Sequence, residues 1–428
     1  MEMKDLKVKT EVIETPGSQE ERLKVDAGIV IDLGNSESRF RVIHENKAIS
    51  HTIIKRNEFA KLSKKYTIPS RYLNENSTIL KIDAAYVDDI FIENEEDEED
   101  KKTRLIANGI IVEREFMNRS VRPTALNTKT SQKVTFWTLR LAFQEAIIYL
   151  ADYYKKKPED IDFTFDVGVL LPPVEEEMYG LEMCEKIKEI KHIETTVPYA
   201  LKKEFTINKV FTLAEGIASF MGVMYKVDNK GELVLNEKNK RFEKGYVIII
   251  DIGSGTTDAL VILNSELVER SRNTFELGGN TILALLDKDI QSEYKHVLTE
   301  REKEELLKTG TFIIGDGKKI NFIEEINEGK EYYSDMLQKK IITMLEGLNI
   351  SLMSIKGILV CGGGALPIKE SIVKNGTPEE RVISPSMSDV LRKYFHDLNP
   401  ELSDVSLDDL NPRLTNLLGI EYIYKFGL

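Results

Sequence analysis

The sequence predicts an α/β protein built from two related halves with a ligand cleft between them. Near its middle, the apolar run at residues 246–250 ends in Asp251, passes a Gly/Ser/Thr turn and is followed by a second apolar run. This pattern is typical of two short strands joined by a tight turn. Residues 28–40 (GIVIDLGNSESRF) carry a similar unit, with Asp32 in the place of Asp251. A repeated unit in a chain of 428 residues indicates a duplicated, two-domain architecture.

The two turns have the composition of phosphate-binding loops. Glycines allow close backbone approach, and successive N–H groups of such a turn form a nest for an anion. A carboxylate at the strand end would repel phosphate, and its presence is explained if a Mg²⁺ ion lies between the two. The residues predicted to hold the phosphates are Gly34, Asn35 and Ser36 in the first turn, and Gly253, Ser254, Gly255, Thr256 and Thr257 in the second.

Three further stretches complete a series of motifs. They read TLAEGIASFMG at residues 212–222, GILVCGGGAL at 357–366 and NPRLTNLLG at 411–419. Taken in chain order, with the turn at residues 28–40 first and that at 245–263 third, the five stretches resemble the phosphate-1, connect-1, phosphate-2, adenosine and connect-2 motifs. These motifs belong to the superfamily of actin, heat-shock protein 70 and the sugar kinases. The resemblance spans residues 25–419. It implies an actin-like (ribonuclease H-like) α/β fold, a duplicated two-lobed ATPase with nucleotide in the central cleft.

The resemblance implies roles for the acidic residues. Asp32 and Asp251 would hold Mg²⁺, and the nucleotide would be ATP, with GTP as the alternative. Glu215, near the start of a predicted helix, would act with Asp251 in catalysis by orienting the water that attacks the γ-phosphate. A second explanation for Glu215 is that a carboxylate in the first turn of a helix is favourable in any case.

Other residues are assigned to the nucleotide on the same resemblance. Arg39 occupies the place of a phosphate-binding lysine in relatives, or it is a solvated strand charge. Lys303 and Glu304 match residues around the adenine and ribose, or they belong to a solvated helix face. The remaining nucleotide-binding residues predicted are Gly278, Gly279, Gly362, Gly363 and Gly364.

Apolar periodicity predicts the elements between the motifs. Helical spacing of apolar residues and charged flanks predict helices at residues 131–157, 175–190, 300–307, 332–348 and 411–424. Apolar runs predict strands at residues 162–171 and 203–210, and turn residues predict hairpins within 226–244 and 313–320. The predicted divisions are a flexible tail (1–24), domain I (25–212, with a variable outer subdomain at about 41–126, completed by 411–428) and domain II (213–410, with an outer subdomain at about 279–335).

The composition excludes several classes of protein. The net charge of −13 argues against direct, non-specific DNA binding over the whole surface. The absence of a long apolar run and of a signal peptide argues against membrane spanning and secretion. Cys184 and Cys361 are far apart and suggest neither a metal site nor a disulfide, which fits a cytoplasmic location. The acidic run at 93–100 is expected to be a solvated loop, or alternatively to bind a basic partner.

Within the superfamily, plasmid-segregation actins of the ParM type resemble this chain most. The resemblance implies ATP-dependent, head-to-tail polymerisation, with filament turnover driven by hydrolysis. An adaptor protein of the ParR type would link the filament to plasmid DNA, so that DNA is contacted only indirectly and no membrane is involved. The alternative is a non-polymerising phosphotransferase or ATPase regulator on the same fold.

Overall fold

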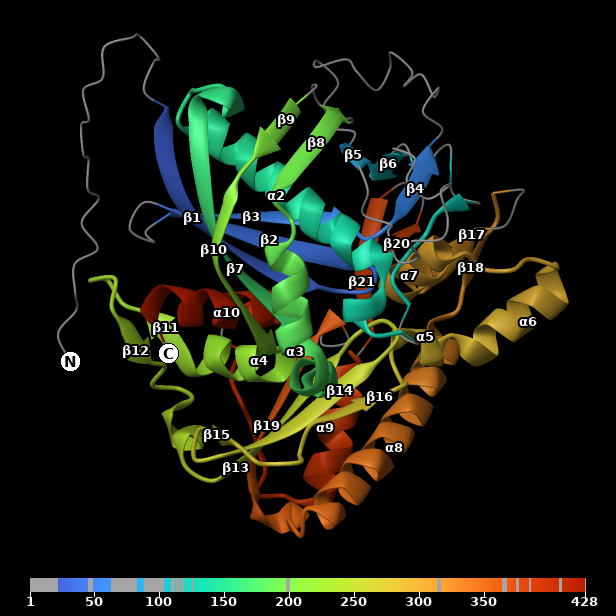
Figure 1. The fold of residues 1–428 in the computed structure, drawn as a ribbon. Helices are drawn as coiled ribbons and strands as arrows, with labels where there is room; N and C mark the ends of the chain where they lie inside the picture. Colours follow the sequence, from blue (N-terminus) through green and yellow to red (C-terminus); the bar gives the residue numbers. More distant parts are fainter. Residues whose placement is uncertain are drawn as a thin grey trace, which may run out of the picture.

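The computed structural model describes residues 22–44, 49–62, 83–87, 104–108, 112, 116, 119–124, 127–197, 201–313, 317–363, 368–374, 377–384, 386–407 and 410–427. The ribbon forms two lobes, one above the other in Figure 1, with a pair of helices between them. The first strand begins at Leu23, two residues inside the predicted tail. Most of that tail and the acidic run at 93–100 lie outside the described residues.

The first lobe is built on a five-stranded sheet with the order β10-β7-β1-β2-β3. β1 is parallel to β7 and antiparallel to β2, and β10 is parallel to β7. The carboxyl ends of β1, β7 and β10 therefore meet at one edge of the sheet, where ligands of α/β proteins usually bind. The strands are β1 (Leu23–Leu33), β2 (Glu37–His44), β3 (Ile49–Arg56), β7 (Ile161–Leu171) and β10 (Thr206–Ala214).

Helices α2 (Lys133–Tyr153) and α3 (Pro173–Lys188) pack on one face of this sheet. Buried residues of α2 recur at helical spacing, as predicted, and Phe143 stacks against Phe205 with ring centroids 4.6 Å apart. Met183 of α3 joins the same core. The predicted helices at 131–157 and 175–190 are confirmed, although each ends earlier than its apolar pattern suggested.

A second sheet of the first lobe has the order β4-β6-β5-β8-β9. It occupies the place of the predicted outer subdomain, but the boundaries differ. β3 lies within 41–126 yet belongs to the main sheet, whereas the two strands that complete the outer sheet come from residues 192–204. The strands are β4 (Phe59–Leu62), β5 (Asp83–Val87), β6 (Arg104–Asn108), β8 (His192–Val197) and β9 (Leu201–Glu204).

The second lobe is built on a sheet with the order β15-β14-β13-β19-β22, and β16 also pairs with β14. The predicted hairpin is confirmed, because β13 and β14 are antiparallel, and β19 lies parallel to β13 on the other side. The strands are β13 (Tyr246–Ile252), β14 (Thr257–Leu263), β15 (Glu266–Leu267), β16 (Asn273–Phe275), β19 (Ile355–Gly362) and β22 (Ser403–Asp404).

One face of the second sheet forms a core with helices that follow the β13–β14 hairpin in the sequence. Ile248 and Val261 of the hairpin share this core with Ile290, Leu337 and Phe395. The helix predicted at 332–348 begins nine residues earlier, at Ile323. The helices of this lobe are α5 (Gly279–Ile282), α6 (Ala284–Tyr294), α7 (Glu300–Thr309), α8 (Ile323–Gly347) and α9 (Met387–Leu398).

Helices α4 (Glu215–Met224) and α10 (Thr415–Phe426) lie between the two sheets (Figure 1). On one side, Phe220 and Val223 of α4 pack on the second sheet. On the other side, Ala218 of α4 joins apolar residues of α10 against the first sheet. The predicted packing of the final helix against the first half is therefore confirmed.

Two glycines bring α4 and α10 into close contact. A Cβ atom on Gly419 would overlap the carbonyl oxygen of Ala218, and one on Gly222 would overlap that of Thr415. The lobes are also joined by an ion pair between Arg272 and Glu176, with a distance of 2.8 Å between Nη1 and Oε2. The connection between the lobes thus includes close backbone packing as well as polar contacts.

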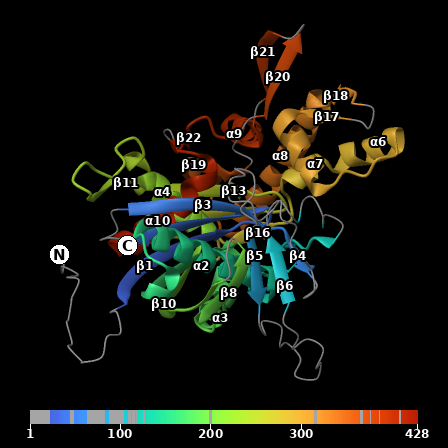
Figure 2. The same ribbon diagram turned by 90° about the horizontal axis from the view of Figure 1, so that it is seen from above.

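Short hairpins and 3₁₀ helices complete the described chain. The hairpins predicted within 226–244 and 313–320 are confirmed, while a third was not predicted and extends away from the second lobe in Figure 2. The hairpins are β11 (Tyr225–Val227) with β12 (Leu233–Leu235), β17 (Thr311–Ile313) with β18 (Lys319–Asn321), and β20 (Ile368–Lys374) with β21 (Thr377–Ser384). The 3₁₀ helices are η3 (Lys129–Ser131), η4 (Pro158–Asp160), η5 (Lys240–Glu243), η6 (Leu352–Ser354) and η8 (Pro412–Leu414).

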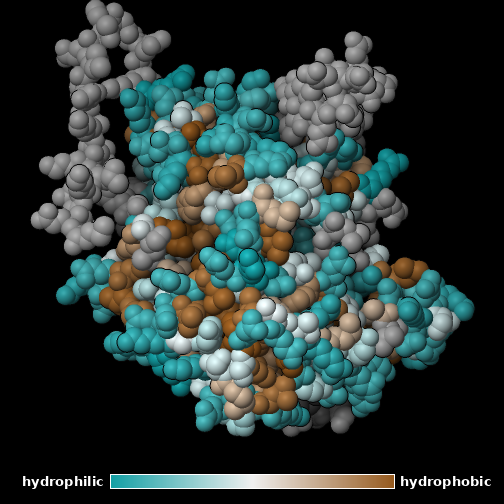
Figure 3. Space-filling view, turned by 60° about the horizontal axis from the view of Figure 1, so that its bottom comes forward, coloured by the Kyte–Doolittle hydropathy of each residue, from teal (hydrophilic) through white to brown (hydrophobic). Residues whose placement is uncertain are grey.

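The face shown in Figure 3 carries many polar side chains, with apolar side chains exposed at several places among them. Met178 and Leu181 of α3 are among the large apolar side chains that are exposed, with Leu181 at 87%. Among the described residues, no helix is long and apolar enough to cross a lipid bilayer.

Candidate active site

The acidic residues of the predicted motifs come together where strands of both lobes end. Asp32 lies at the end of β1, Asp251 lies near the end of β13, and Glu215 begins α4 directly after β10. All three are buried, and the charges of Asp32 and Asp251 act on Glu215. The fold therefore brings the two repeated units and the connect-1 motif to one site.

In the first turn, the charge of Asp32 is balanced by Arg39. The distance between Arg39 Nη1 and Asp32 Oδ2 is 3.1 Å, and the Arg39 side chain is only 14% exposed. Arg39 is therefore not a solvated strand charge, because its guanidinium is held against a buried carboxylate. Glu37, inside the same turn, lies 3.5 Å from the other terminal nitrogen of Arg39.

The first turn is stabilised by Asn57, which the sequence analysis did not single out. The buried amide of Asn57 donates hydrogen bonds to the Gly34 carbonyl oxygen and, at 2.6 Å, to the Ser38 hydroxyl. Its side-chain oxygen accepts a hydrogen bond from the Thr138 hydroxyl at 3.0 Å. Its backbone N–H also donates to the Ser36 carbonyl oxygen at 2.9 Å, so one residue fixes the backbone of the turn through both its side chain and its main chain. The other predicted residues of this turn, Asn35 and Ser36, are half-buried.

The second turn is stabilised by backbone contacts instead. The N–H of Gly279 donates to the Gly253 carbonyl oxygen at 3.0 Å, and the N–H of Asn280 donates to the Ser254 carbonyl oxygen at 2.8 Å. A Cβ atom on Gly278 would lie within 2.7 Å of the Ser254 carbonyl oxygen. The predicted residues Gly278 and Gly279 therefore lie against the second turn, and glycine is required for this approach. Gly255 and Thr256 are half-buried in the same turn.

Thr257 and Asp258, which follow the turn, have different surroundings. The Thr257 hydroxyl is fully buried, donates to the Leu277 carbonyl oxygen at 2.7 Å and lies 2.5 Å from the Tyr333 hydroxyl. It belongs to the core of the second lobe, so these contacts do not support its prediction as a phosphate ligand. Asp258 accepts a hydrogen bond from Thr274 at 2.5 Å, and burial raises the pKa of its carboxyl to about 7.

Glu215 forms a buried ion pair with Lys129. The distance between Lys129 Nζ and Glu215 Oε1 is 2.6 Å, and both side chains are about nine-tenths buried. Lys129 lies in η3, just before α2, and was not predicted as a site residue. Since 86 positions separate it from Glu215, no spacing in the sequence links the two.

Burial and charge shift the pKa values of this group strongly. Burial raises the pKa of Glu215 to about 8, the Lys129 ammonium opposes this shift, and three neighbouring carboxylates add to it. Burial lowers the pKa of Lys129, but the nearby carboxylates, Glu215 above all, outweigh burial and the net shift is upward. Strongly shifted groups of this kind are typical of functional sites.

Asp251 is held by the connect-2 motif. The amide of Asn416, at the start of α10, donates to Asp251 Oδ2 at 2.5 Å. Burial raises the pKa of Asp251, the hydrogen bond from Asn416 opposes the shift, and repulsion by Asp32 adds to it. The Ser219 hydroxyl of α4 in turn contacts the Asn416 side-chain oxygen. Both helices between the lobes thus contribute to the site.

The adenosine motif lies next to Asp251. Gly362 ends β19 with φ of +81°, and a Cβ atom there would overlap Asp251 Oδ1, so only glycine suits this position. The next residue, Gly363, is exposed and lies close to the guanidinium of Arg413. A Cβ atom built on Gly363 would be 3.7 Å from Arg413 Nε. Gly364 lies outside the described residues.

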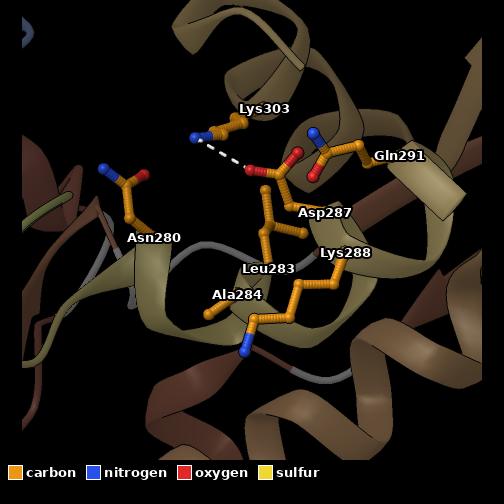
Figure 4. Close-up of a pocket in the computed structure, with 7 residues that line it drawn as sticks. All are labelled: Asn280, Leu283, Ala284, Asp287, Lys288, Gln291 and Lys303. Carbon is orange, nitrogen blue, oxygen red and sulfur yellow. Dashed lines mark ion pairs between the residues drawn. The ribbon is translucent and has the colours of Figure 1, made fainter. Parts of the chain in front are cut away.

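Helix α7 directs its two predicted residues to different places. Lys303 lies 3.3 Å from Asp287 of α6, at a pocket of about 260 Å³ shown in Figure 4. Burial raises the pKa of Glu304, while cations that include Arg56 and Arg122 of the first lobe oppose the shift. Glu304 therefore lies within reach of the charges of first-lobe cations, whereas Lys303 pairs with Asp287 of α6. The contact of these two residues with the adenine and ribose stays a prediction.

The fold relates the chain to proteins of known structure. The crystal structure of Ta0583, an archaeal actin homologue, superposes with a TM-score of 0.62 at 15% identity and covers 94% of this chain and 100% of its own. The chain has an actin-like fold. A 15-stranded ParM filament from Clostridium botulinum gives a TM-score of 0.61 at 14% identity, with 94% and 100% coverage. ParM from Bacillus thuringiensis with ATP gives 0.55 at 14%, with 92% and 97% coverage.

Sequence comparison relates a smaller part of this actin-like chain to a family. Residues 249–374 match the model of the C-terminal region of the archaeal, MreB-like actin homologues. The matched stretch includes the second turn, Gly278 and Gly279, and the adenosine motif. No curated protein sequence matches the chain. Ta0583 has also been solved in complex with ADP, at a TM-score of 0.58, 16% identity and coverage of 93% and 99%.

Proposed function

We propose that this actin-like chain binds ATP and Mg²⁺ in its cleft, hydrolyses the nucleotide and assembles into filaments. The observation that carries the proposal is the meeting of Asp32, Asp251 and Glu215, from both lobes, at one buried site. The nucleotide complexes of Ta0583 and of the Bacillus thuringiensis ParM lend further support. GTP is the alternative nucleotide.

Asp32 and Asp251 have the donor chemistry for Mg²⁺. Within the described part of the chain, no group of three or more His, Cys, Asp or Glu side chains is placed to hold a metal by itself. Mg²⁺ in nucleotide sites usually takes one or two carboxylates together with phosphates and water, so a pair of carboxylates fits. Repulsion by Asp32 contributes to the raised pKa of Asp251, and a cation held by these carboxylates would reduce that repulsion. Bound Mg²⁺ would neutralise negative charge on the phosphates.

The chain's own residues would provide the remaining chemistry. Backbone N–H groups of the two turns would bind phosphate oxygens, with Arg39 as a nearby cation. Glu215 would orient the attacking water and accept its proton. Because its pKa is about 8, its carboxylate is a base matched to slightly alkaline pH. Catalysis would come mainly from positioning and charge compensation.

The biological role that we propose is movement of cargo by a head-to-tail polymer. A heterologous contact that repeats without closing generates a filament, and hydrolysis would weaken that contact. The resemblance to ParM-type proteins makes plasmid DNA, bound through an adaptor protein of the ParR type, the proposed cargo. An exposed helix face with Met178 and Leu181 offers an apolar surface of the kind that polymer contacts use.

The test is light scattering of the purified protein on addition of ATP with Mg²⁺, with ADP as the control, followed by electron microscopy of the same samples. We expect a rise with ATP that decays as ATP is consumed, and filaments on the grid. The variant Glu215→Gln should still polymerise, but its signal should persist because hydrolysis is slow. GTP in place of ATP gives the nucleotide preference.

A flat trace over a wide range of protein concentration, with nucleotide hydrolysis intact, would contradict filament formation. That result would favour the alternative, a non-polymerising phosphotransferase or ATPase regulator on the same fold. Small acceptors would then be screened for phosphorylation. If the chain neither binds nor hydrolyses ATP or GTP, the proposed function fails as a whole.

A further inference from the structure

The short helix η3 carries a buried cation into the site. Lys129 is 8% exposed and its Nζ lies 2.6 Å from Glu215 Oε1. A buried ammonium loses its hydration, so it is stable here only because carboxylates surround it. The Lys129 ammonium is therefore bound to Glu215 instead of being hydrated by solvent.

Helix α3 holds η3 in place from behind. Glu175 Oε1 accepts a hydrogen bond from the Thr130 N–H at 2.7 Å and another from the Thr130 hydroxyl at 3.0 Å. Lys186 Nζ donates to the Thr130 carbonyl oxygen at 3.0 Å. Both backbone groups of Thr130 are thus fixed by side chains of one helix, which restricts where the adjacent Lys129 can lie.

We propose that Lys129 is a positioning residue for Glu215, and that Glu175 and Lys186 position Lys129 in turn. This inference rests on the proposed hydrolysis of nucleotide. Lys129 would hold one oxygen of Glu215, so that the other is directed to water. It would also favour the ionised form of the carboxyl, which proton acceptance requires.

The charges around Glu215 show why a cation is needed there. Asp258 of β14, Asp32 of β1 and Asp251 of β13 all act on Glu215, and each favours its neutral form. Lys129 of η3 is the cation that opposes them. Without it, burial and three carboxylates would raise the pKa of Glu215 further, so a smaller fraction of the carboxyl would be ionised at slightly alkaline pH, and a protonated carboxyl cannot act as a base.

The test compares Lys129→Met with Lys129→Arg in the full chain. For Lys129→Met we expect ATP affinity within about threefold of wild type and kcat lower by at least about tenfold. The pH of half-maximal rate should move upward, because loss of the cation raises the pKa of Glu215. Lys129→Arg should recover part of kcat, since it restores the charge. Lys156→Met, at an exposed lysine after α2, is the control.

A second comparison addresses the support from α3. Glu175→Gln should lower kcat in the same direction as Lys129→Met but less, because one acceptor oxygen remains. Glu177→Gln, at an exposed glutamate on the same helix, should leave kcat unchanged. In nucleotide-free protein, the urea midpoints of Lys129→Met, Glu215→Gln and the double variant should be non-additive, because the two residues act as a pair.

The inference is overturned if wild type hydrolyses ATP and Lys129→Met has the same kcat and pH profile. Additive urea midpoints would overturn it as well. If wild type does not hydrolyse nucleotide, the proposed function fails and this role of Lys129 fails with it. The double-mutant comparison of urea midpoints then still shows whether the ion pair exists, which distinguishes a missing pair from a missing activity.

Discussion

The two repeated hairpins have similar sequences but are stabilised in different ways. In the β1–β2 hairpin, Asp32 is paired with Arg39, and the turn is fixed by the side chain of Asn57. In the β13–β14 hairpin, Asp251 accepts a hydrogen bond from the neutral amide of Asn416, and the turn is fixed by the backbone next to Gly278. A short motif therefore specifies the backbone path of a turn but not the groups that support it.

The two hairpins also differ in how the charge of their aspartate is compensated. Asp32 has a cation of this chain beside it, whereas the direct partner of Asp251 is neutral and its pKa is raised by burial. A bound cation would therefore compensate Asp251 more than Asp32. The first hairpin is expected to bind phosphate, and the second to bind the metal more strongly.

The largest effect is expected from removing each acidic group in turn. Asp251→Asn should lower the Mg²⁺-dependent rate of ATP hydrolysis by about 100-fold or more, because it removes the metal's main charge. Asp32→Asn should lower this rate clearly less, since Arg39 already compensates the charge of Asp32. The measurement is kcat as a function of Mg²⁺ concentration. Equal losses in the two variants would show that the hairpins share the metal equally and would refute the assignment.

Smaller effects are expected when the support of each turn is removed. Asn57→Ala leaves buried polar groups of the first turn without their partner, and should lower the free energy of unfolding by about 1–3 kcal/mol. Gly278→Ala forces a Cβ atom into the second turn and should cost about 1–3 kcal/mol. Urea denaturation measures both.

Two controls belong to this comparison. Ser254→Ala, in the second turn, should change the free energy of unfolding by less than about 0.5 kcal/mol, because its backbone rather than its side chain supports the turn. Gly347→Ala places its Cβ atom in open space near the end of α8 and should be neutral or slightly stabilising. A loss in Gly347→Ala as large as that in Gly278→Ala would mean that close backbone contact is not the cause.

The smallest effect is a dependence of stability on pH. In the folded protein the pKa of Glu215 is about 8 and that of Asp258 about 7, both above their ordinary values. The folded state therefore holds these protons more tightly than the unfolded state, and their contribution to stability is lost as pH rises through 7 to 8. We expect nucleotide-free protein to become less stable between pH 5 and pH 8.

The variants Glu215→Gln and Asp258→Asn isolate this contribution from the general effect of net charge. Each should reduce the loss in free energy of unfolding between pH 5 and pH 8, by about 1.4 kcal/mol for each pH unit over which the wild-type carboxyl keeps its proton only in the folded state. Urea denaturation at pH 5, 6.5 and 8 gives the comparison. If the slopes of both variants equal that of wild type, the two carboxyl groups titrate normally and the site is less buried than described.

Much of the fold was predictable because its signals are local. The apolar runs that end in Asp32 and Asp251 specify strands, and the glycines after them specify tight turns. The helical spacing of Phe143 and its neighbours specifies α2. Boundaries were less certain, since the residues that extend α8 to Ile323 carry a weaker apolar pattern. The assignment of β3 to the main sheet was missed, because strand pairing depends on distant partners.

Residues that are neighbours along the chain were enough to predict the two hairpins, the order of the five motifs and the glycines that permit close approach at Gly278 and Gly362. These depend on backbone conformation and on neighbours along the chain. The pairs of Lys129 with Glu215 and of Lys303 with Asp287 become visible only in the folded chain. Such contacts join residues from separate elements, and their energies come from burial and charge at short distance, which no local pattern encodes.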